Sequence, residues 1–288
     1  MGQKKFVAKV LLLFSVGLLL AFKPWPAVAD RADTATAADH GGQARQGDAP
    51  PAAGSEPLAE LLATAYPVGE VLHYDVTWMG LTAGRLTMEI KQLGQSGDLY
   101  AIDVTAQTAG MLGAIYPVDD EFRVVVRGER RLPEQYRNVQ RHGNRPPRVR
   151  VTMYDQQEGR IIYQRDLDEP ERYQVEVPIY NEFAAFYAMR LMPLSREREV
   201  IVPTFADEER HEVPVVVEEF VTRDSIFGSR ETMLVRPQLK FVGLYDKAGD
   251  PQIWLTADEY RIPLRIRSRI AIGSLIATLT HYEGPANR

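Results

Sequence analysis

The stretch Val71-Leu72-His73-Tyr74-Asp75-Val76-Thr77-Trp78 places an apolar side chain at every second position from residue 72. Successive side chains of a β-strand point to opposite faces of a sheet, so this alternation is typical of a strand with one buried face. The same period returns in residues 85–90 and 100–105. Glycines at positions 80, 84, 94 and 97 separate the three runs, where hairpin turns or bulges need positive φ. The sequence therefore predicts antiparallel β-structure.

Similar runs cover the chain up to residue 282. Strands are predicted over residues 121–127, 135–141, 149–154, 160–165, 173–177, 200–204, 212–222, 231–236, 253–256, 264–271 and 275–282. Because short connections join them, the expected fold is mainly β, a large curved antiparallel sheet or an open or closed barrel. One helix is expected on its concave side, capped by Asn181, formed by residues 182–192 and ended by Pro193.

Residues 1–29 have the features of a secretory signal peptide. Three lysines precede an apolar run from Val10 to Phe22, and Ala27-Val28-Ala29 precedes Asp30. The run is shorter than the roughly 20 residues of a spanning helix. We expect cleavage after Ala29 and a periplasmic protein, with an uncleaved anchor as the alternative. Residues 30–57 predict a disordered linker, because they hold no apolar periodicity, and residues 58–288 predict a single β-rich domain.

Composition excludes several classes of protein. The chain has 288 residues, no cysteine and a net charge of −5 at pH 7. Without cysteine it has no thiolate nucleophile, thiolate metal site or disulfide. An acidic exported protein is a poor ligand for nucleic acid, so no nucleic-acid partner is expected.

The catalytic and metal-binding templates fail on inspection. His211-Glu212-Val213-Pro214-Val215 begins like a zinc-protease helix, but it lacks the second histidine and proline breaks the required helix. Residues 94–97 are too short for a nucleophile elbow, and residues 166–170 lack the glycine and third ligand of a calcium loop. We therefore predict no catalytic residue, no metal site and no cofactor.

The predicted helix carries an aromatic stripe of Phe183, Phe186 and Tyr187, followed by Arg190. Residues at this spacing share one helix face, and such stripes mostly pack against a core. Lining a ligand cavity between helix and sheet is the other interpretation. The two interpretations are compatible.

Short motifs along the chain resemble a bacterial exported family, domain of unknown function 3108. The motifs are Gly69 to Tyr74 with Trp78, Gly80 and Gly84; the helix ending in Tyr187 to Arg190; Trp254 to Asp258 with Arg261 to Pro263; and Gly273-Ser274. The resemblance extends over about residues 66–283 and implies an exported, mainly β protein without known catalytic residues. Together with the stripe, these motifs give the candidate ligand-binding residues Tyr74, Trp78, Phe183, Phe186, Tyr187, Arg190, Trp254 and Asp258.

Arginine departs most from the acidic average. Nine arginines lie between Arg123 and Arg150, and Arg265, Arg267 and Arg269 alternate along one predicted strand. The last three share a strand face, which predicts an anion-binding surface, because guanidinium groups recognise phosphates and carboxylates. Cross-strand pairing with carboxylates is the alternative for both groups.

These features favour a non-enzymatic periplasmic binding or envelope-maintenance protein. An apolar or lipid ligand between helix and sheet, and an anionic envelope surface, are the expected partners. Two alternatives remain open, an envelope-polymer hydrolase using carboxylates such as Asp258, and a structural partner domain.

Overall fold

The computed structural model describes residues 56–95, 97–206, 208–238, 250–270 and 272–287. The predicted signal peptide and all but the last two residues of the predicted linker lie outside the described residues. Within the described ranges, no helix is long and apolar enough to cross a membrane.

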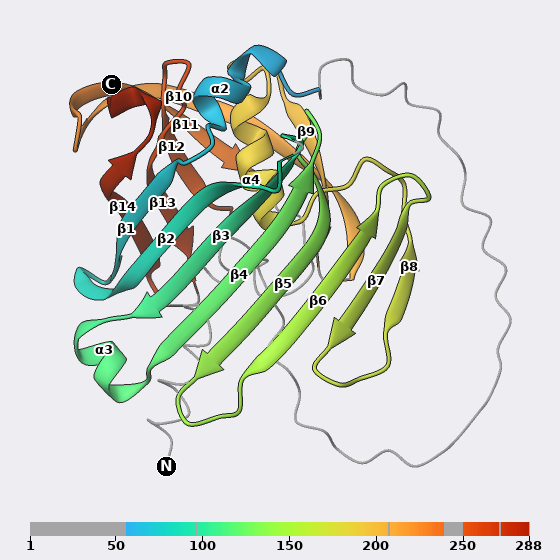
Figure 1. Cartoon of the computed structure of the whole chain (residues 1–288). Helices are drawn as coiled ribbons and strands as arrows, with labels where there is room; N and C mark the ends of the chain where they lie inside the picture. Colours follow the sequence, from blue (N-terminus) through green and yellow to red (C-terminus); the bar gives the residue numbers. More distant parts are fainter. Residues whose placement is uncertain (1–55, 96, 207, 239–249, 271, 288) are drawn as a thin grey trace, which may run out of the picture.

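Fourteen strands of the described residues form one antiparallel sheet (Figure 1). They are β1 (Val71–Trp78), β2 (Leu81–Leu93), β3 (Leu99–Thr108), β4 (Val118–Arg127), β5 (Leu132–His142), β6 (Arg148–Asp155), β7 (Arg160–Arg165), β8 (Glu171–Gln174), β9 (Val200–Ala206), β10 (Glu209–Ser225), β11 (Gly228–Pro237), β12 (Gln252–Thr256), β13 (Pro263–Arg269) and β14 (Ser274–Glu283). Their order is β8-β7-β6-β5-β4-β3-β2-β1-β14-β13-β12-β11-β10-β9. Since β8 and β9 are edges, the sheet is open, and the predicted antiparallel fold is confirmed in that form.

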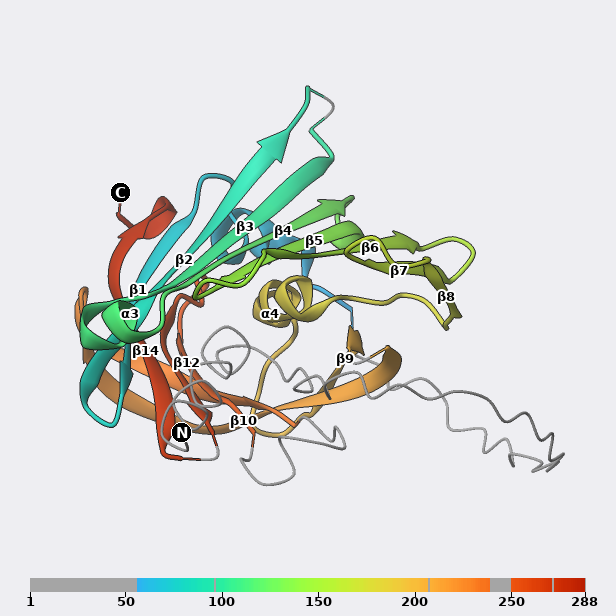
Figure 2. The ribbon, with the colours of Figure 1, turned by 90° about the horizontal axis from the view of Figure 1, so that it is seen from below.

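The sheet curls on itself around a central helix. Figure 2 shows the strands from β1 to β8 facing those around β9 to β12, with α4 (Glu182–Leu191) between them. Bulges interrupt the register between Val76 and Thr77 in β1 and between Val217 and Glu219 in β10. A bulge adds local twist and bend, which helps a many-stranded sheet to curl instead of lying flat.

The predicted helix is confirmed as α4. The side chain of Asn181 accepts a hydrogen bond from the backbone N–H of Ala184 at 3.0 Å, and the backbone leaves the helical region at Met192. The expectation of a single helix was incomplete. Short helical segments also occur at η1 (Ala59–Leu61), α2 (Leu62–Ala65), α3 (Gly110–Ile115) and η3 (Pro285–Asn287). Each is too short for a helical period to be readable in the sequence.

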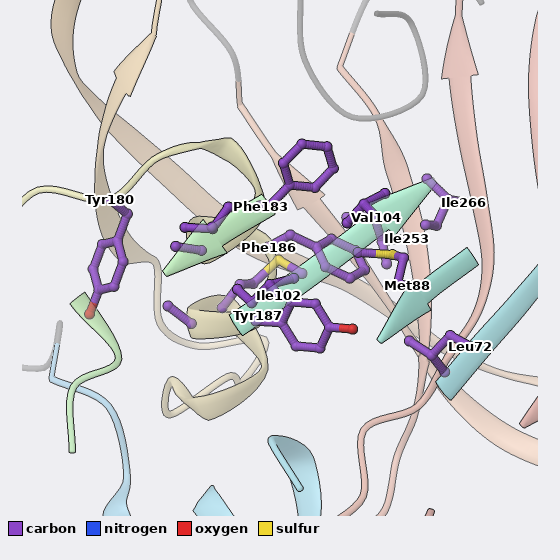
Figure 3. Packing of buried hydrophobic residues seen from close by; sticks show 14 of the residues in the cluster. Leu72, Met88, Ile102, Val104, Tyr180, Phe183, Phe186, Tyr187, Ile253 and Ile266 are labelled. Atoms are coloured by element: carbon purple, nitrogen blue, oxygen red, sulfur yellow. The ribbon is translucent and has the colours of Figure 1, made fainter. Parts of the chain in front are cut away.

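The core fills the space between α4 and the concave face of the sheet (Figure 3). Leu72 of β1, Met88 of β2 and Ile102 of β3 are wholly buried there. Ile266 of β13 belongs to the same core and is also fully buried. The alternation read from residues 71–105 thus separates the concave, apolar face from the outer face.

Candidate functional site

The aromatic stripe of α4 is part of this core. Phe183 packs against Phe122 at a centroid distance of 5.0 Å and against Tyr136 at 6.1 Å. Tyr187 has no exposed surface and lies 5.0 Å from the ring of Tyr66, whereas Phe186 packs edge-on against Tyr187. Packing against the concave face is therefore the observed role of the stripe.

Arg190, in the last turn of the same helix, forms an ion pair whose two side chains have no exposed surface. Its guanidinium donates to both carboxylate oxygens of Glu70, at 2.7 and 2.8 Å, and to the backbone oxygens of Tyr260 and Arg261. Burial alone would lower the pKa of Arg190, but the adjacent carboxylate raises it above its ordinary value. Arg261 donates back to the Arg190 carbonyl at 2.8 Å. Arg190 thus holds α4 to the start of β1 and to the turn before β13.

Three of the remaining candidates have local structural partners. The hydroxyl of Tyr74 donates to the Pro263 carbonyl, and Trp78 Nε1 donates to the Ile272 carbonyl, both at 2.8 Å. Asp258 is a turn residue, since its Oδ1 accepts from the Thr256 hydroxyl at 2.6 Å and from two backbone N–H groups. The carboxylate of Asp258 is therefore engaged within its own turn, and Trp78 is partly buried against the core.

Trp254 lies on the outer face of the sheet, away from the helix. Its neighbours Ile253 and Leu255 enter the core, and Trp254 points the other way, opposite Arg265 in the register of β12 and β13. The Arg265 guanidinium lies 5.8 Å from the indole centroid, and that of Arg223 from β10 lies 4.4 Å from it. Trp254 thus has two guanidinium groups within about 6 Å of its ring centroid, an arrangement that cation–π attraction stabilises.

The predicted row of arginines is found on this outer face. Leu264 and Ile266 point into the core while Arg265, Arg267 and Arg269 point outward. We call Arg223, Trp254, Arg265, Arg267 and Arg269 the arginine–tryptophan face. The sequence interpretation missed Arg223, because simple alternation from Val215 and Val217 would turn it inward.

Within the described ranges, no carboxylate lies within 4.0 Å of a guanidinium nitrogen of this face. The Nε atoms of Arg223 and Arg265 and the Trp254 Nε1 are buried without a hydrogen-bond partner there. Burial, and then the charges of Arg223 and Arg267, lower the pKa of Arg265. In the part of the chain that the structure describes, the face is therefore a cluster of like charges without a carboxylate in ion-pair contact.

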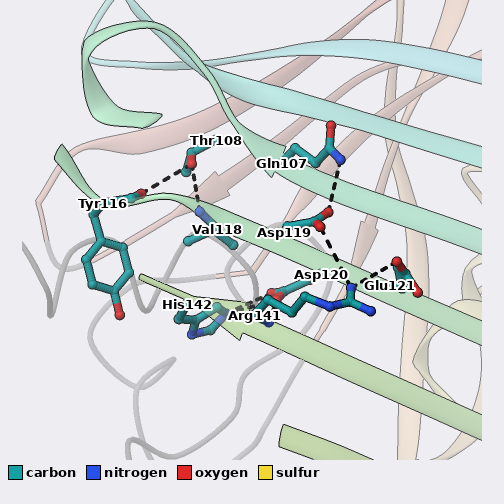
Figure 4. A network of polar contacts seen from close by, with 9 residues as sticks. All are labelled: Gln107, Thr108, Tyr116, Val118, Asp119, Asp120, Glu121, Arg141 and His142. Carbon is teal, nitrogen blue, oxygen red and sulfur yellow. Dashed lines mark hydrogen bonds and ion pairs between the residues drawn. The ribbon is translucent and has the colours of Figure 1, made fainter. Parts of the chain in front are cut away.

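The other arginine-rich segment differs, because four of its nine arginines, Arg123, Arg127, Arg130 and Arg141, form ion pairs with carboxylates. Arg123 of β4 binds both carboxylate oxygens of Asp103, at 2.6 and 2.8 Å. Arg141 donates to Glu121 at 2.9 Å and lies 3.8 Å from Asp119 (Figure 4). Charge pairing, the alternative to anion binding, therefore describes these four arginines.

An exposed apolar group lies at the end of the sheet toward which the arginine row runs. Arg269 pairs with Ser274 at the start of β14, where Leu275 lies opposite Trp78 at the end of β1. The turn from β1 to β2 and the neighbouring α3 are at this end (Figure 1). They expose four large apolar side chains, between 61% and 78% accessible, that we call the apolar tip: Met79, Leu81, Met111 and Ile115.

The segment that begins like a zinc-protease helix, residues 211–215, forms part of a strand. His211 lies in β10, not on a helix, and its Nε2 is 3.0 Å from the Ala206 carbonyl. Among the described residues, no group of three or more histidines and carboxylates has the arrangement of a metal site.

Comparisons with known proteins give a family and a fold. A family model described as "Protein of unknown function (DUF3108)" matches residues 73–280. No curated protein matches the chain. Among solved structures, it is similar to a beta-barrel-like protein of domain of unknown function DUF1849 from Brucella abortus, with a TM-score of 0.51 and 11% identity over 75% of this chain and 97% of that chain. At this identity the likeness shows the fold alone.

Proposed function

The chain belongs to the DUF3108 family, and we propose that it is an exported, non-enzymatic binding protein of the bacterial envelope that attaches to anionic membrane surfaces. The observation that carries the proposal is the arginine–tryptophan face, whose guanidinium groups have no ion-pair partner among the described carboxylates. The guanidinium groups of Arg223 and Arg265 lie 4.4 and 5.8 Å from the Trp254 ring centroid, and the charge of Arg267 acts on Arg265, without a described carboxylate within 4.0 Å of these guanidinium groups. Phosphate groups of a lipid surface supply the missing negative charge.

The apolar tip favours a membrane over a soluble anionic polymer. Four exposed apolar side chains at the end near Arg269 suit insertion at the boundary between headgroups and acyl chains. Arginines beside such side chains lie at headgroup depth and keep their charge there. The engaged carboxylate of Asp258 supports binding over the hydrolase alternative.

Co-sedimentation with liposomes tests the proposal. At low salt, wild-type protein should sediment with liposomes that contain anionic phospholipid and stay in solution with neutral ones. Each arginine near the surface contributes about 1 kcal/mol, so replacing Arg265, Arg267 and Arg269 together by glutamine should weaken binding about a hundredfold. Added salt should weaken wild-type binding as well.

A matched control separates this face from net charge. Replacing Arg123, Arg127 and Arg141 by glutamine removes the same formal charge from arginines that pair with carboxylates. This control should bind anionic liposomes far better than the first triple variant. Equal loss in both variants, or no sedimentation of the wild type, would rule out the proposal.

Export is the second component of the proposal, and the leader-like residues 1–29 support it. N-terminal sequencing of protein from the periplasmic fraction should read from Asp30. Recovery of the uncut chain in the inner membrane would identify residues 1–29 as an anchor.

A second candidate function is carriage of an apolar or lipid ligand between α4 and the sheet. The buried stripe of Phe183, Phe186 and Tyr187 inside a curled, open sheet favours it. Binding of an apolar fluorescent probe that the wild type shows and Phe186→Ala alters severalfold would support this candidate.

A further inference from the structure

A pocket of about 840 Å³ opens at the end of the sheet opposite the apolar tip. It lies where α2 and the segment before β1 meet the end of β14, and its lining includes Leu62, Tyr66, Val68, Arg131 and Glu283. Its size lies within the roughly 300–1,000 Å³ of small-molecule sites. The predicted ligand-binding residues contribute nothing to this lining.

Arg131 is the cationic residue of this pocket, and only 8% of its surface is exposed. Its guanidinium lies 3.6 Å from the ring centroid of Tyr100 and 5.5 Å from that of Tyr66. Among the described residues, its one side-chain hydrogen bond is to the Gly128 carbonyl, at 2.9 Å, and its buried Nε has no partner. A buried charge is costly unless it is paired, so the site has an unmet requirement for an anion.

The carboxylate in the lining does not meet that requirement. Glu283 is exposed, accepts from His281 at 3.2 Å, and makes no ion pair with Arg131 within 4.0 Å. Two aromatic rings hold the guanidinium in place, which leaves its remaining N–H groups for a ligand.

The rest of the lining is mostly apolar. Leu62, Pro67 and Val68 form one wall and Pro285 contributes to another. Half of the Val68 surface is exposed, so this side chain is accessible to a ligand in the pocket. An apolar wall beside a buried cation suits a molecule with an anionic head and a hydrocarbon chain.

We propose that this pocket binds a single-chain anionic amphiphile, with its carboxylate or phosphate head at Arg131 and its chain along Leu62 and Val68. The site is separate from the arginine–tryptophan face, which lies on the outer side of β10 to β13. Its ligand is one molecule held in a pocket, whereas the face meets an extended surface.

Calorimetric titration below micellar concentrations tests this site, with decanoate, decyl phosphate and decanol as probes. Wild-type protein should bind at least one of the two anions about tenfold or more tightly than decanol, and comparison of the two anions identifies the preferred head. Arg131→Gln should reduce anion binding to the level of decanol. Arg123→Gln, which removes an exposed arginine, should leave all three affinities unchanged.

Val68→Trp keeps Arg131 and fills the pocket, so it should weaken all three ligands. This variant decides the matter if Arg131→Gln fails to fold, because undiminished anion binding by Val68→Trp would overturn the proposal. Equal binding of decanol and both anions to the wild type, or no binding of either anion, would also overturn it. None of these outcomes alters the liposome test of the outer face.

Discussion

Arg190 and Glu70 form a bidentate ion pair without exposed surface, although 120 positions separate them in the sequence. The pair joins the last turn of α4 to the residue before β1. Two buried charges lose their hydration, and each is tolerated because the other is present. The pair therefore fixes where the helix sits inside the curled sheet.

Removing one partner should be costly. Glu70→Gln preserves the side-chain shape but leaves the Arg190 charge buried, so we expect a loss of about 3–5 kcal/mol in the free energy of unfolding. Glu70→Gln combined with Arg190→Met should lose less than the sum of the single variants. Urea denaturation of the complete double-mutant cycle measures this coupling.

The control for this cycle is Asp75→Asn, because Asp75 and Arg85 form an exposed pair at 3.8 Å. That variant should change stability by less than about 1 kcal/mol. A similarly small effect of Glu70→Gln would contradict the assigned role of the buried pair.

Phe186→Ala should destabilise the protein by about 3–5 kcal/mol, since it leaves a cavity between α4 and the sheet. Leu167→Ala is the matched control, because Leu167 is 98% exposed and should change stability by about 0.5 kcal/mol or less. Chemical denaturation distinguishes the two. A loss well under half the expected figure, with altered binding of an apolar probe, would favour a ligand cavity over simple packing.

Alkaline pH should destabilise the fold through its buried tyrosines. Burial raises the pKa of Tyr180 to about 12, although the nearby charge of Arg130 opposes the shift. Above about pH 10, tyrosines of the unfolded chain ionise while Tyr180 in the folded protein keeps its proton. The folded state then binds more protons, so its stability is complete below pH 10 and falls as pH rises toward 12.

Tyr180→Phe tests the assignment of this pH dependence. Its free energy of unfolding should fall less steeply between pH 10 and 12, by up to one proton in the slope, because other buried tyrosines remain. Denaturation curves at pH 8, 10 and 11 measure the slope. An unchanged slope in Tyr180→Phe would show that this hydroxyl does not contribute.

Local sequence patterns predicted much of the fold and part of the candidate site. Alternation gave β1 to β3 and the outward row of Arg265 to Arg269, because each rests on neighbouring residues. The partner of Arg190 could not be predicted in this way, since pairing across 120 residues leaves no local signal. Pocket formation around Arg131 depends equally on distant segments.

A bulge in β10 explains why simple alternation does not predict the face on which Arg223 lies. Val217 lies opposite Val235 in the core, but the bulge that follows places Glu219, not residue 218, opposite Leu234. The face of every later residue in β10 is thereby reversed, so Arg223 reaches Trp254 on the outside. The bulge has no clear signature in the sequence.

Arg265→Gln should make the protein more stable at low salt. The like charges of Arg223 and Arg267 both act on Arg265, and the described residues place no carboxylate within 4.0 Å of the Arg265 guanidinium to offset the repulsion. Removing the charge of Arg265 relieves that repulsion, against a loss of about 0.5–1 kcal/mol in stacking on Trp254.

The salt dependence of stability gives the sharper measurement, because screening weakens repulsion between half-buried charges. From 20 to 300 mM NaCl, wild-type stability should rise, and the rise should be smaller in Arg265→Gln. Arg123→Gln, which breaks a favourable pair with Asp103, should instead be slightly less stable than the wild type at low salt. If wild type and Arg265→Gln respond equally to salt, the arginines of this face do not repel one another appreciably, and the electrostatic reason for anion binding there is lost.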